Sequence, residues 1–210
     1  REFTEKYLGV YDAGWDALRE QRQARAVALG IIPPGTSMVR MSTTDDWDSY
    51  TADEQRYQAK RMAVYAGMID AMDHHLGRLV QHLKDIGEYD NTIFIFSSDN
   101  GAEASGGDSV RSPLMRLSLH LSDYTNDYDT LGEKGSFNSI GPSFASAAVG
   151  PLAYYKFYVG EGGMRVPLII AGVPMSTKDQ WTNAFAWVTD ITPTILDLAG
   201  VKPPAGHYGG

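Results

Sequence analysis

The sequence has no cysteine among its 210 residues. Disulfides, thiolate metal sites and cysteine nucleophiles are therefore excluded from these residues. Many exported proteins also lack disulfides, so this absence does not point to a compartment, and no localisation is predicted.

Long apolar runs are missing as well. The longest candidate, residues 166–175, is interrupted by Pro167 and Pro174. It is much shorter than the roughly 18–20 apolar residues that a helix needs to span a bilayer. We therefore expect no membrane span.

Positive charge is scarce relative to negative charge. Lysine and arginine number 18 against 26 aspartates and glutamates, which gives a formal net charge of -8. A surface of this sign repels a phosphate backbone, so nucleic acid is not expected as a partner. The composition, with 43% hydrophobic and 21% charged residues, is typical of a globular domain with its own core.

Two helices are predicted in the first half of the chain. Residues 15–29 are amphipathic and are followed by Gly30. A longer helix begins after Thr51, which fits a capping box with Glu54, and Gly87 is expected to end it. Its apolar residues recur at spacings of three and four and are expected to form one stripe in the core: Met62, Tyr65, Ile69, Met72, Leu76, Leu79, Val80 and Leu83.

Two short strands are predicted to be buried. Residues 92–98 are apolar and β-branched or aromatic, so we expect them to be covered on both faces, and residues 165–171 form a second buried strand. A long helix leading into such a strand is typical of a layered α/β domain. Residues 101–150 are rich in Gly, Ser, Asn and Asp, which predicts a long irregular loop of the kind that is usually functional.

A final helix is predicted after Asp190. The aspartate is expected to cap it, and Pro193 lies in the first turn, where its missing N–H has no helical partner to lose. Gly200 is expected to end this helix.

The first candidate site follows the predicted strand, where residues 98–101 read Ser-Asp-Asn-Gly. Ligands of open α/β sheets bind beyond the carboxyl ends of strands. Asp99 offers a carboxylate and Asn100 an amide oxygen, both of which suit Ca²⁺ or Mg²⁺. Gly101 would let the backbone turn around an ion. The alternative is a plain turn, since Asp-Asn-Gly is also favourable turn chemistry.

The second candidate is Lys156, which precedes a glycine turn at residues 161–167, Glu-Gly-Gly-Met-Arg-Val-Pro. A lysine there could hold an anionic group as a compact point charge. The alternative is an ordinary surface lysine. Asp45, Asp46 and Asp48 form a further acidic cluster, for which a solvated charge run is favoured over a metal site.

Taken together, these stretches resemble the sulfatases, and within them the bacterial arylsulfatases. Residues 83–103, which contain the strand and Ser-Asp-Asn-Gly-Ala-Glu, look like the family's second metal-binding segment. Lys156, five residues before Glu161, is similar to the family's lysine and its EGGxRVP turn. Residues 192–200 look like its TPTLLDLAG helix, and residues 11–14 resemble the stretch after a histidine-bearing active-site loop.

The resemblance implies a fold and a chemistry. The fold is the alkaline-phosphatase-like α/β sandwich, with a mixed β-sheet between helices, present here only in part. The chemistry is hydrolysis of a small-molecule sulfate ester by a hydrated formylglycine beside a bound Ca²⁺, with Mg²⁺ the less favoured ion. By position, Asp99 and Asn100 would be metal ligands, Asp99 would also take a proton from the nucleophile, and Lys156 would bind a sulfate oxygen. A divalent ion and a lysine would supply the positive charge that such a transition state needs.

The sequence departs from the family because it contains no nucleophile motif. There is no C/S-x-P-x-R, and residues 112–116, Ser-Pro-Leu-Met-Arg, have the proline misplaced. We expect residues 1–210 to be a partial sulfatase catalytic domain, inactive alone, with the formylglycine upstream of Arg1. Two alternatives stay open: a phosphodiesterase or phosphonate monoester hydrolase of the same fold, and a non-catalytic sulfatase-like binding module. No oligomeric state is predicted.

Overall fold

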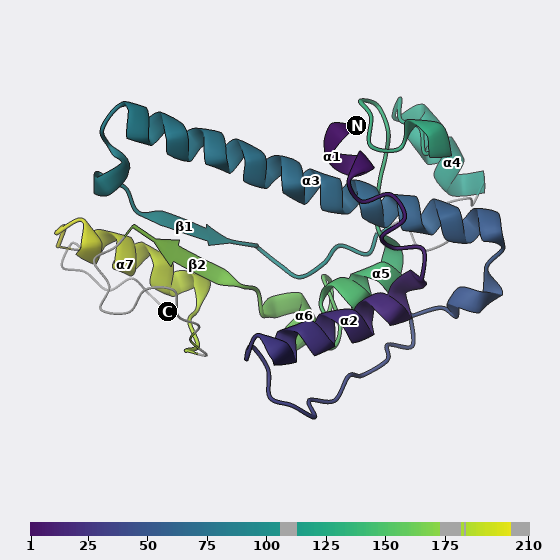
Figure 1. Ribbon diagram of the computed structural model, residues 1–210, viewed down its shortest axis with the longest axis horizontal. Coiled ribbons are helices and arrows are strands. Elements are labelled where there is room, and N and C mark those ends of the chain that lie inside the picture. The colour runs from purple at the N-terminus through teal and green to yellow at the C-terminus, as the bar shows by residue number, and fades with distance from the viewer. Residues whose placement is uncertain (106–112, 173–181, 183, 203–210) are drawn as a thin grey trace. The chain divides into compact units, whose positions relative to one another are not determined.

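The computed structural model describes residues 1–105, 113–172, 182 and 184–202 (Figure 1). The chain divides into two compact units, Arg1–Pro174 and Met175–Gly210. In chain order the helices and strands are α1 (Glu2–Glu5), α2 (Gly14–Ala28), α3 (Ala52–Asp85), β1 (Phe94–Ser97), α4 (Pro113–Leu121), α5 (Gly141–Ala148), α6 (Glu161–Met164), β2 (Leu168–Ala171) and α7 (Ile191–Leu198). Short 3-10 turns lie at Trp47–Ser49, Tyr89–Asn91, Tyr128–Thr130 and Val188–Asp190.

The long helix α3 begins with the predicted capping box. The Thr51 N–H donates to the Glu54 carboxylate at 3.0 Å, and the Glu54 N–H donates to the Thr51 hydroxyl at 3.4 Å. These two bonds satisfy donors that the first helical turn leaves without partners. At the other end the Gly87 N–H donates to the Lys84 carbonyl and Gly87 adopts a φ of 77°. Both predicted ends of this helix are confirmed.

The core of the first unit lies between α2, α3 and α5. Trp15 and Phe144 are completely buried and meet edge to face, with ring centroids 5.4 Å apart. Trp47 packs edge-on against Trp15 at 4.6 Å, and Met62 joins the same cluster. Large aromatic side chains in such contacts supply much of the apolar area that a core buries.

Helix α5 corrects the expectation that residues 101–150 form an irregular loop. Of this stretch, residues 106–112 lie outside the described part, while α4, α5 and the turn Tyr128–Thr130 are regular. The sequence of α5, Gly-Pro-Ser-Phe-Ala-Ser-Ala-Ala, begins with turn residues, but its proline lies in the first turn, where a helix tolerates it, and its three alanines favour a helix. Packing of Phe144 in the core adds to this local preference and stabilises the helix.

The two predicted strands pair with each other in an antiparallel ladder. Phe94 faces Ala171 and Ser97 faces Leu168 across it. Among the described residues the sheet has only these two strands, so the first unit combines helices with a small sheet. The run 166–175 contains β2, and its residues 173–175 lie outside the described part.

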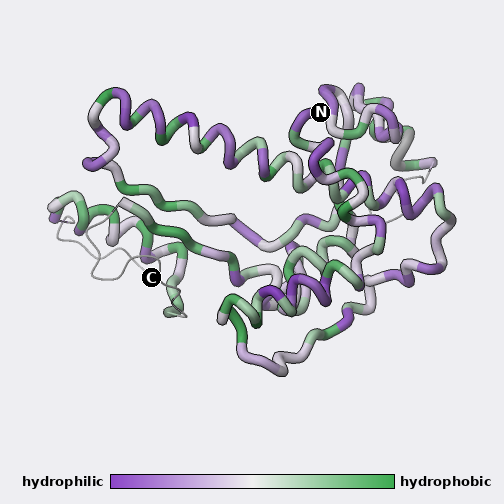
Figure 2. Tube along the Cα trace, in the orientation of Figure 1, coloured by the Kyte–Doolittle hydropathy of each residue, from purple (hydrophilic) through white to green (hydrophobic). Residues whose placement is uncertain are grey.

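Burial of the strands was predicted wrongly. All of β2 is exposed, and Ile169 retains 57% of its accessible surface. The last two residues of β1 are exposed as well. Figure 2 shows both strands as apolar stretches. The apolar sequence pattern is typical of a strand that is covered on both faces, yet these residues keep much of their surface exposed.

The apolar stripe of α3 is also only partly in the core. Met62 is 4% exposed, whereas Ile69, Met72 and Leu79 retain 46%, 44% and 48% of their accessible surface. The stripe follows the predicted helical period, but the buried residues of α3 all lie in its first half, between Tyr57 and Gly67. The expectation that the whole stripe lies in the core is therefore wrong for its later turns.

The second unit contains the predicted helix α7. Its end is confirmed: the Gly200 and Val201 N–H groups donate to the carbonyls of Asp197 and Leu196, which is a Schellman motif with Gly200 at a φ of 67°. Asp190 occupies the predicted N-cap position of α7, but its side chain does not make the expected cap bond. Its carboxylate does not cap α7 and instead accepts the Trp187 N–H at 2.7 Å, which closes the preceding 3-10 turn.

No described helix combines the length and the apolar character needed to cross a membrane.

Candidate functional site

The loop that leaves β1 presents two oxygen-bearing side chains. Ser97 and Ser98 hold its backbone, because their hydroxyls donate to the carbonyls of Pro167 at 3.0 Å and of Asn100 at 2.8 Å. The side chain of Asp99 is exposed. Within the described part of the chain, the side chains of Asp99 and Asn100 make no hydrogen bond. Their oxygens are therefore available to a ligand.

Three glycines allow close backbone contacts at this junction: Gly101 packs the loop against the glycine turn at α6, and Gly162 and Gly163 pack that turn against residues 153–158. A Cβ on Gly101 would lie 1.7 Å from the Gly162 carbonyl oxygen, and the Gly101 N–H donates to the Gly163 carbonyl at 2.9 Å. A Cβ on Gly162 would lie 2.1 Å from the Tyr154 carbonyl, and one on Gly163 would lie 2.5 Å from the Tyr158 carbonyl. The backbones touch directly, so any side chain at these positions would force them apart.

The same junction fixes the segment that carries Lys156. The Lys156 N–H donates to the Ala102 carbonyl at 3.1 Å. Tyr154 and Phe157, on either side of the lysine, adopt left-handed φ angles of 69° and 79°. Such angles cost roughly 1 kcal/mol or more for a residue with a side chain, and the surrounding structure must hold them. Tyr155 provides an anchor, since it is buried and its hydroxyl donates to the Thr43 hydroxyl at 2.7 Å.

The Lys156 ammonium pairs with Glu103. Its Nζ lies 2.8 Å from Glu103 Oε2, and Glu103 Oε1 accepts the Ser105 N–H at 2.6 Å. The hydrogen bond to Glu103 raises the pKa of Lys156, and the negative charges of Glu103 and then Asp99 add to it. Burial acts to raise the pKa of Glu103, but hydrogen bonds from Lys156 and Ser105 outweigh burial, so that pKa is lowered. Both groups are therefore charged at neutral pH.

The structure brings the two candidate segments predicted from the sequence together. The loop with Asp99 and Asn100 is bonded to the Lys156 segment through Ala102. No role was predicted for Glu103 from the sequence. The sequence shows a carboxylate two residues beyond the Ser-Asp-Asn-Gly turn. Its ion pair with Lys156, about 50 residues later in the chain, is a contact that no local sequence pattern predicts.

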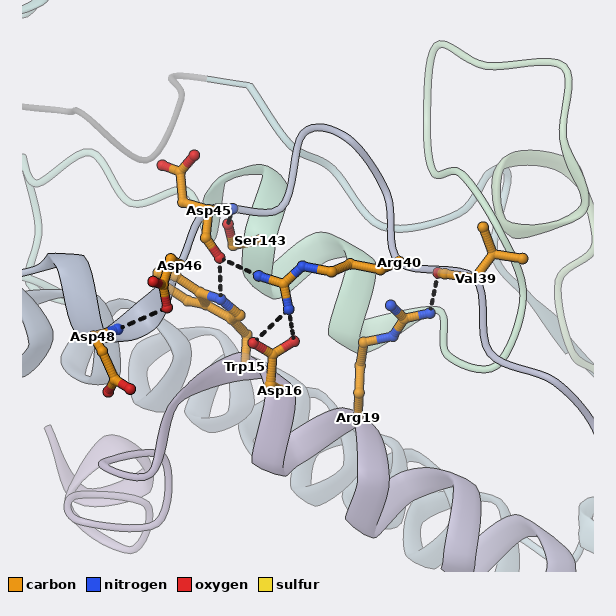
Figure 3. Close-up of polar contacts among 9 residues, drawn as sticks. All are labelled: Trp15, Asp16, Arg19, Val39, Arg40, Asp45, Asp46, Asp48 and Ser143. Atoms are coloured by element: carbon orange, nitrogen blue, oxygen red, sulfur yellow. Dashed lines mark hydrogen bonds and ion pairs between the residues drawn. The ribbon is translucent and has the colours of Figure 1, made fainter.

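The segment that carries the acidic cluster, residues 45–48, is held in place by hydrogen bonds (Figure 3). The Arg40 guanidinium contacts both carboxylate oxygens of Asp16 at 2.7 Å and donates to the Asp45 carbonyl at 2.8 Å. The hydrogen bond to Asp16 raises the pKa of Arg40. The Asp46 carboxylate accepts the Asp48 N–H at 3.2 Å and so caps the 3-10 turn.

Further bonds hold this acidic segment to the core (Figure 3). Trp15 Nε1 donates to the Asp45 carbonyl at 3.0 Å, and the Asp45 N–H donates to the Ser143 hydroxyl at 3.0 Å. Arg19 donates to the Val39 carbonyl at 2.6 Å. Nowhere in residues 1–105, 113–172 and 184–202 do three or more His, Asp or Glu side chains converge as a metal site would require. These contacts favour a structural role for the cluster.

Asp99 and Asn100 fit a calcium ion as part of a ligand set. A carboxylate and an amide carbonyl are both oxygen donors of the type that Ca²⁺ accepts, and neither is engaged by another described side chain. Calcium takes six to eight oxygens, so two residues cannot complete its shell. The remaining ligands would be backbone carbonyls, water or side chains outside the described residues.

Comparison with known proteins identifies the family. The family model described as Sulfatase matches residues 1–201. An uncharacterized sulfatase of Schizosaccharomyces pombe is 38% identical over 212 residues, covering 100% of this chain and 38% of the relative. An arylsulfatase of Klebsiella aerogenes is 34% identical over 203 residues, covering 96% and 43%.

A third relative has a broader name. The multifunctional alkaline phosphatase superfamily protein PehA of Trinickia caryophylli is 40% identical over 160 residues, covering 76% of this chain and 22% of the relative. The chain spans less than half the length of each of these three relatives. Because the family model covers nearly the whole sequence, the chain belongs to the sulfatase family.

Proposed function

We propose that the protein containing these residues is a sulfuric ester hydrolase of the arylsulfatase type. The observation that carries the proposal is the junction that bonds the Asp99–Asn100 loop to the Lys156 segment. The arylsulfatase among the relatives supports the reaction class. We infer that residues 1–210 belong to the catalytic domain, which has the alkaline-phosphatase-like sandwich with a mixed sheet.

Asp99 and Asn100 are the proposed metal ligands in this chain. Each would give one oxygen to a calcium ion, which supplies concentrated positive charge beside the sulfate oxygens when bound. Calcium suits this pair better than magnesium, because it tolerates irregular sets of carboxylate and carbonyl oxygens. Asp99 is also the proposed proton acceptor for the nucleophile, a formylglycine expected outside residues 1–210.

Lys156 is the proposed binding group for the sulfate ester. Its ammonium is charged, as the raised pKa requires. Its backbone is fixed to Ala102 and it lies on a segment anchored through Tyr155. A fixed positive charge that meets negative charge developing on the sulfate oxygens lowers the barrier, because it does not need to reorganise during the reaction.

A phosphodiester or phosphonate monoester hydrolase is the second candidate. The relative named as a multifunctional alkaline phosphatase superfamily protein favours it. The same oxygen ligands and lysine would suit a phosphoryl group, which also carries negative charge on its oxygens. A non-catalytic sulfatase-like binding module is the third candidate, and it predicts ligand binding without turnover.

Turnover by the natural full-length protein distinguishes these candidates. We expect release of 4-nitrophenol from 4-nitrophenyl sulfate, loss of that activity after chelation with EGTA, and much slower turnover of bis(4-nitrophenyl) phosphate. Asp99→Asn should lower kcat/KM by about 100-fold or more, whereas Asp73→Asn, an exposed aspartate on α3, should leave it unchanged. A preference for the phosphate diester would favour the second candidate, and no turnover of either ester would favour the third.

A further inference from the structure

We propose that Glu103 is a positioning residue that holds the Lys156 ammonium at the exit of β1 and shares it with the anionic group of the substrate. This proposal rests on the proposed function of Lys156 and extends it to a residue with no role assigned so far. The pair itself is direct, with Lys156 Nζ 2.8 Å from Glu103 Oε2.

The Glu103 carboxylate is fixed at its other oxygen. Oε1 accepts the Ser105 N–H at 2.6 Å, so one oxygen binds the backbone and the other binds the lysine. The two segments are also bonded through the Lys156 N–H and the Ala102 carbonyl, directly before Glu103. The carboxylate is therefore a fixed point relative to the lysine backbone.

A lysine side chain needs such a partner if its ammonium is to stay at a defined position. Its four-carbon stem is flexible and populates many rotamers when it is free. The side chain of Lys156 retains 37% of its accessible surface, so packing alone does not restrain it. The bond to Glu103 selects the rotamers that bring Nζ toward the Asp99 loop, where the charge of Asp99 already acts on it.

The pair is also weak enough to share its cation. The two side chains are 37% and 41% exposed, and ion pairs of that exposure contribute little because water screens them. An ammonium has three N–H donors, so it can keep the bond to Glu103 and donate to a sulfate oxygen as well. Glu103 would thus orient the lysine without removing it from the substrate.

A double-mutant cycle on the natural full-length protein tests this proposal. The four proteins are the wild type, Glu103→Gln, Lys156→Ala and the double variant, and the measurement is kcat and KM for 4-nitrophenyl sulfate. If Glu103 acts through Lys156, Glu103→Gln should lower kcat/KM on the order of tenfold in the wild type and have almost no effect in the Lys156→Ala background. Glu103→Asp, which keeps the charge, should recover part of the loss.

Glu88→Gln is the matched control. Glu88 is an exposed glutamate whose carboxylate accepts only a long 3.5 Å bond from Asn91 among the contacts described. The Glu88→Gln substitution should leave kcat/KM unchanged both in the wild type and in the Lys156→Ala background. Equal losses from Glu103→Gln with and without Lys156 would overturn the proposal, because a merely structural effect does not depend on the lysine.

Calorimetry of inorganic sulfate binding to the same four proteins distinguishes a failure of the positioning role of Glu103 from a failure of the proposed hydrolase function. Turnover without coupling between the two residues would leave the hydrolase standing and remove the role of Glu103. Coupled losses of sulfate affinity without turnover would leave the positioning role standing and remove the hydrolase. Equal losses in both backgrounds, or no sulfate binding and no coupling in turnover, would overturn the positioning role.

Discussion

Replacement of Gly101 by alanine is the sharpest perturbation of the proposed site. The added Cβ would lie 1.7 Å from the Gly162 carbonyl oxygen and 3.1 Å from the Gly163 Cα. A carbon and a carbonyl oxygen normally approach no closer than about 3.3 Å. The two backbones must therefore separate by more than an ångström, which is large for a close-packed interior.

The cost of Gly101→Ala follows from two contributions. Separation of the backbones breaks the 2.9 Å hydrogen bond from the Gly101 N–H to the Gly163 carbonyl, which is worth about 1 kcal/mol. Overpacking adds about 1–3 kcal/mol. We expect the free energy of unfolding to fall by about 2–4 kcal/mol and activity to be lost with it, because the Asp99 loop moves away from Lys156.

Urea unfolding of the natural protein, followed by circular dichroism, measures this effect. Gly77→Ala is the control, because Gly77 lies in α3 with no heavy atom within 4 Å of an added Cβ. Alanine there should stabilise the helix by about 0.5–1 kcal/mol. A Gly101→Ala protein that unfolds like the wild type and keeps full activity would refute the reasoning, since the close backbone approach could not then exist.

Three further predictions concern the core, the lysine segment and the ion pair. Phe144→Ala should lower the free energy of unfolding by about 3–5 kcal/mol, because it leaves a cavity beside Trp15; a loss below 1 kcal/mol would contradict the placement of α5 in the core. Tyr155→Phe removes the bond to Thr43 and should cost about 1 kcal/mol of stability, together with an increase in KM. Because folding lowers the pKa of Glu103, the stability advantage of the wild type over Glu103→Gln should be constant above the ordinary glutamate pKa of about 4.3 and should shrink as the pH falls below it. Urea titrations between pH 3 and pH 7 check this, and an advantage that grows on acidification would contradict it.

Local signals in the sequence predicted local structure well. The capping box at Thr51 and the helix end at Gly200 each depend on residues within one helical turn, and the structure confirms both. The two strands lie inside their predicted ranges. These features depend on short-range hydrogen bonds and on backbone conformations that few residue types adopt.

Features that depend on distant contacts were predicted poorly. Helix α5 was missed because the Gly, Ser, Asn and Asp residues of the wider stretch 101–150 indicate a loop, and its core contact joins Phe144 to Trp15, about 130 residues away. Asp190 differs, because its contact is local: it occupies the predicted N-cap position, but its carboxylate accepts the Trp187 N–H and not an N–H of α7. The apolar pattern of β2 correctly reported a strand but not its surroundings, because a pattern records what a segment can bury and not what covers it.

For the candidate site, the sequence likewise indicated the individual residues but not the contacts between them. Asp99, Asn100 and Lys156 stood out by their residue types and neighbours, and each had an ordinary turn or surface interpretation when taken alone. The three glycine contacts and the bond from Lys156 to Ala102 join these segments. Such backbone contacts between segments more than about 50 residues apart leave no periodic signal in the sequence, so the role proposed for Glu103 depends on the structure.

The most direct test of the central claim is the effect of removing the Lys156 ammonium on sulfate ester hydrolysis. The measurement is kcat/KM of the natural full-length protein for 4-nitrophenyl sulfate in the presence of Ca²⁺, for the wild type, Lys156→Ala and the exposed control Lys134→Ala. The account predicts calcium-dependent turnover that falls by about 100-fold or more in Lys156→Ala and is unchanged in Lys134→Ala. Equal activity in all three proteins would contradict the claim that Lys156 and the Asp99–Asn100 loop form one site.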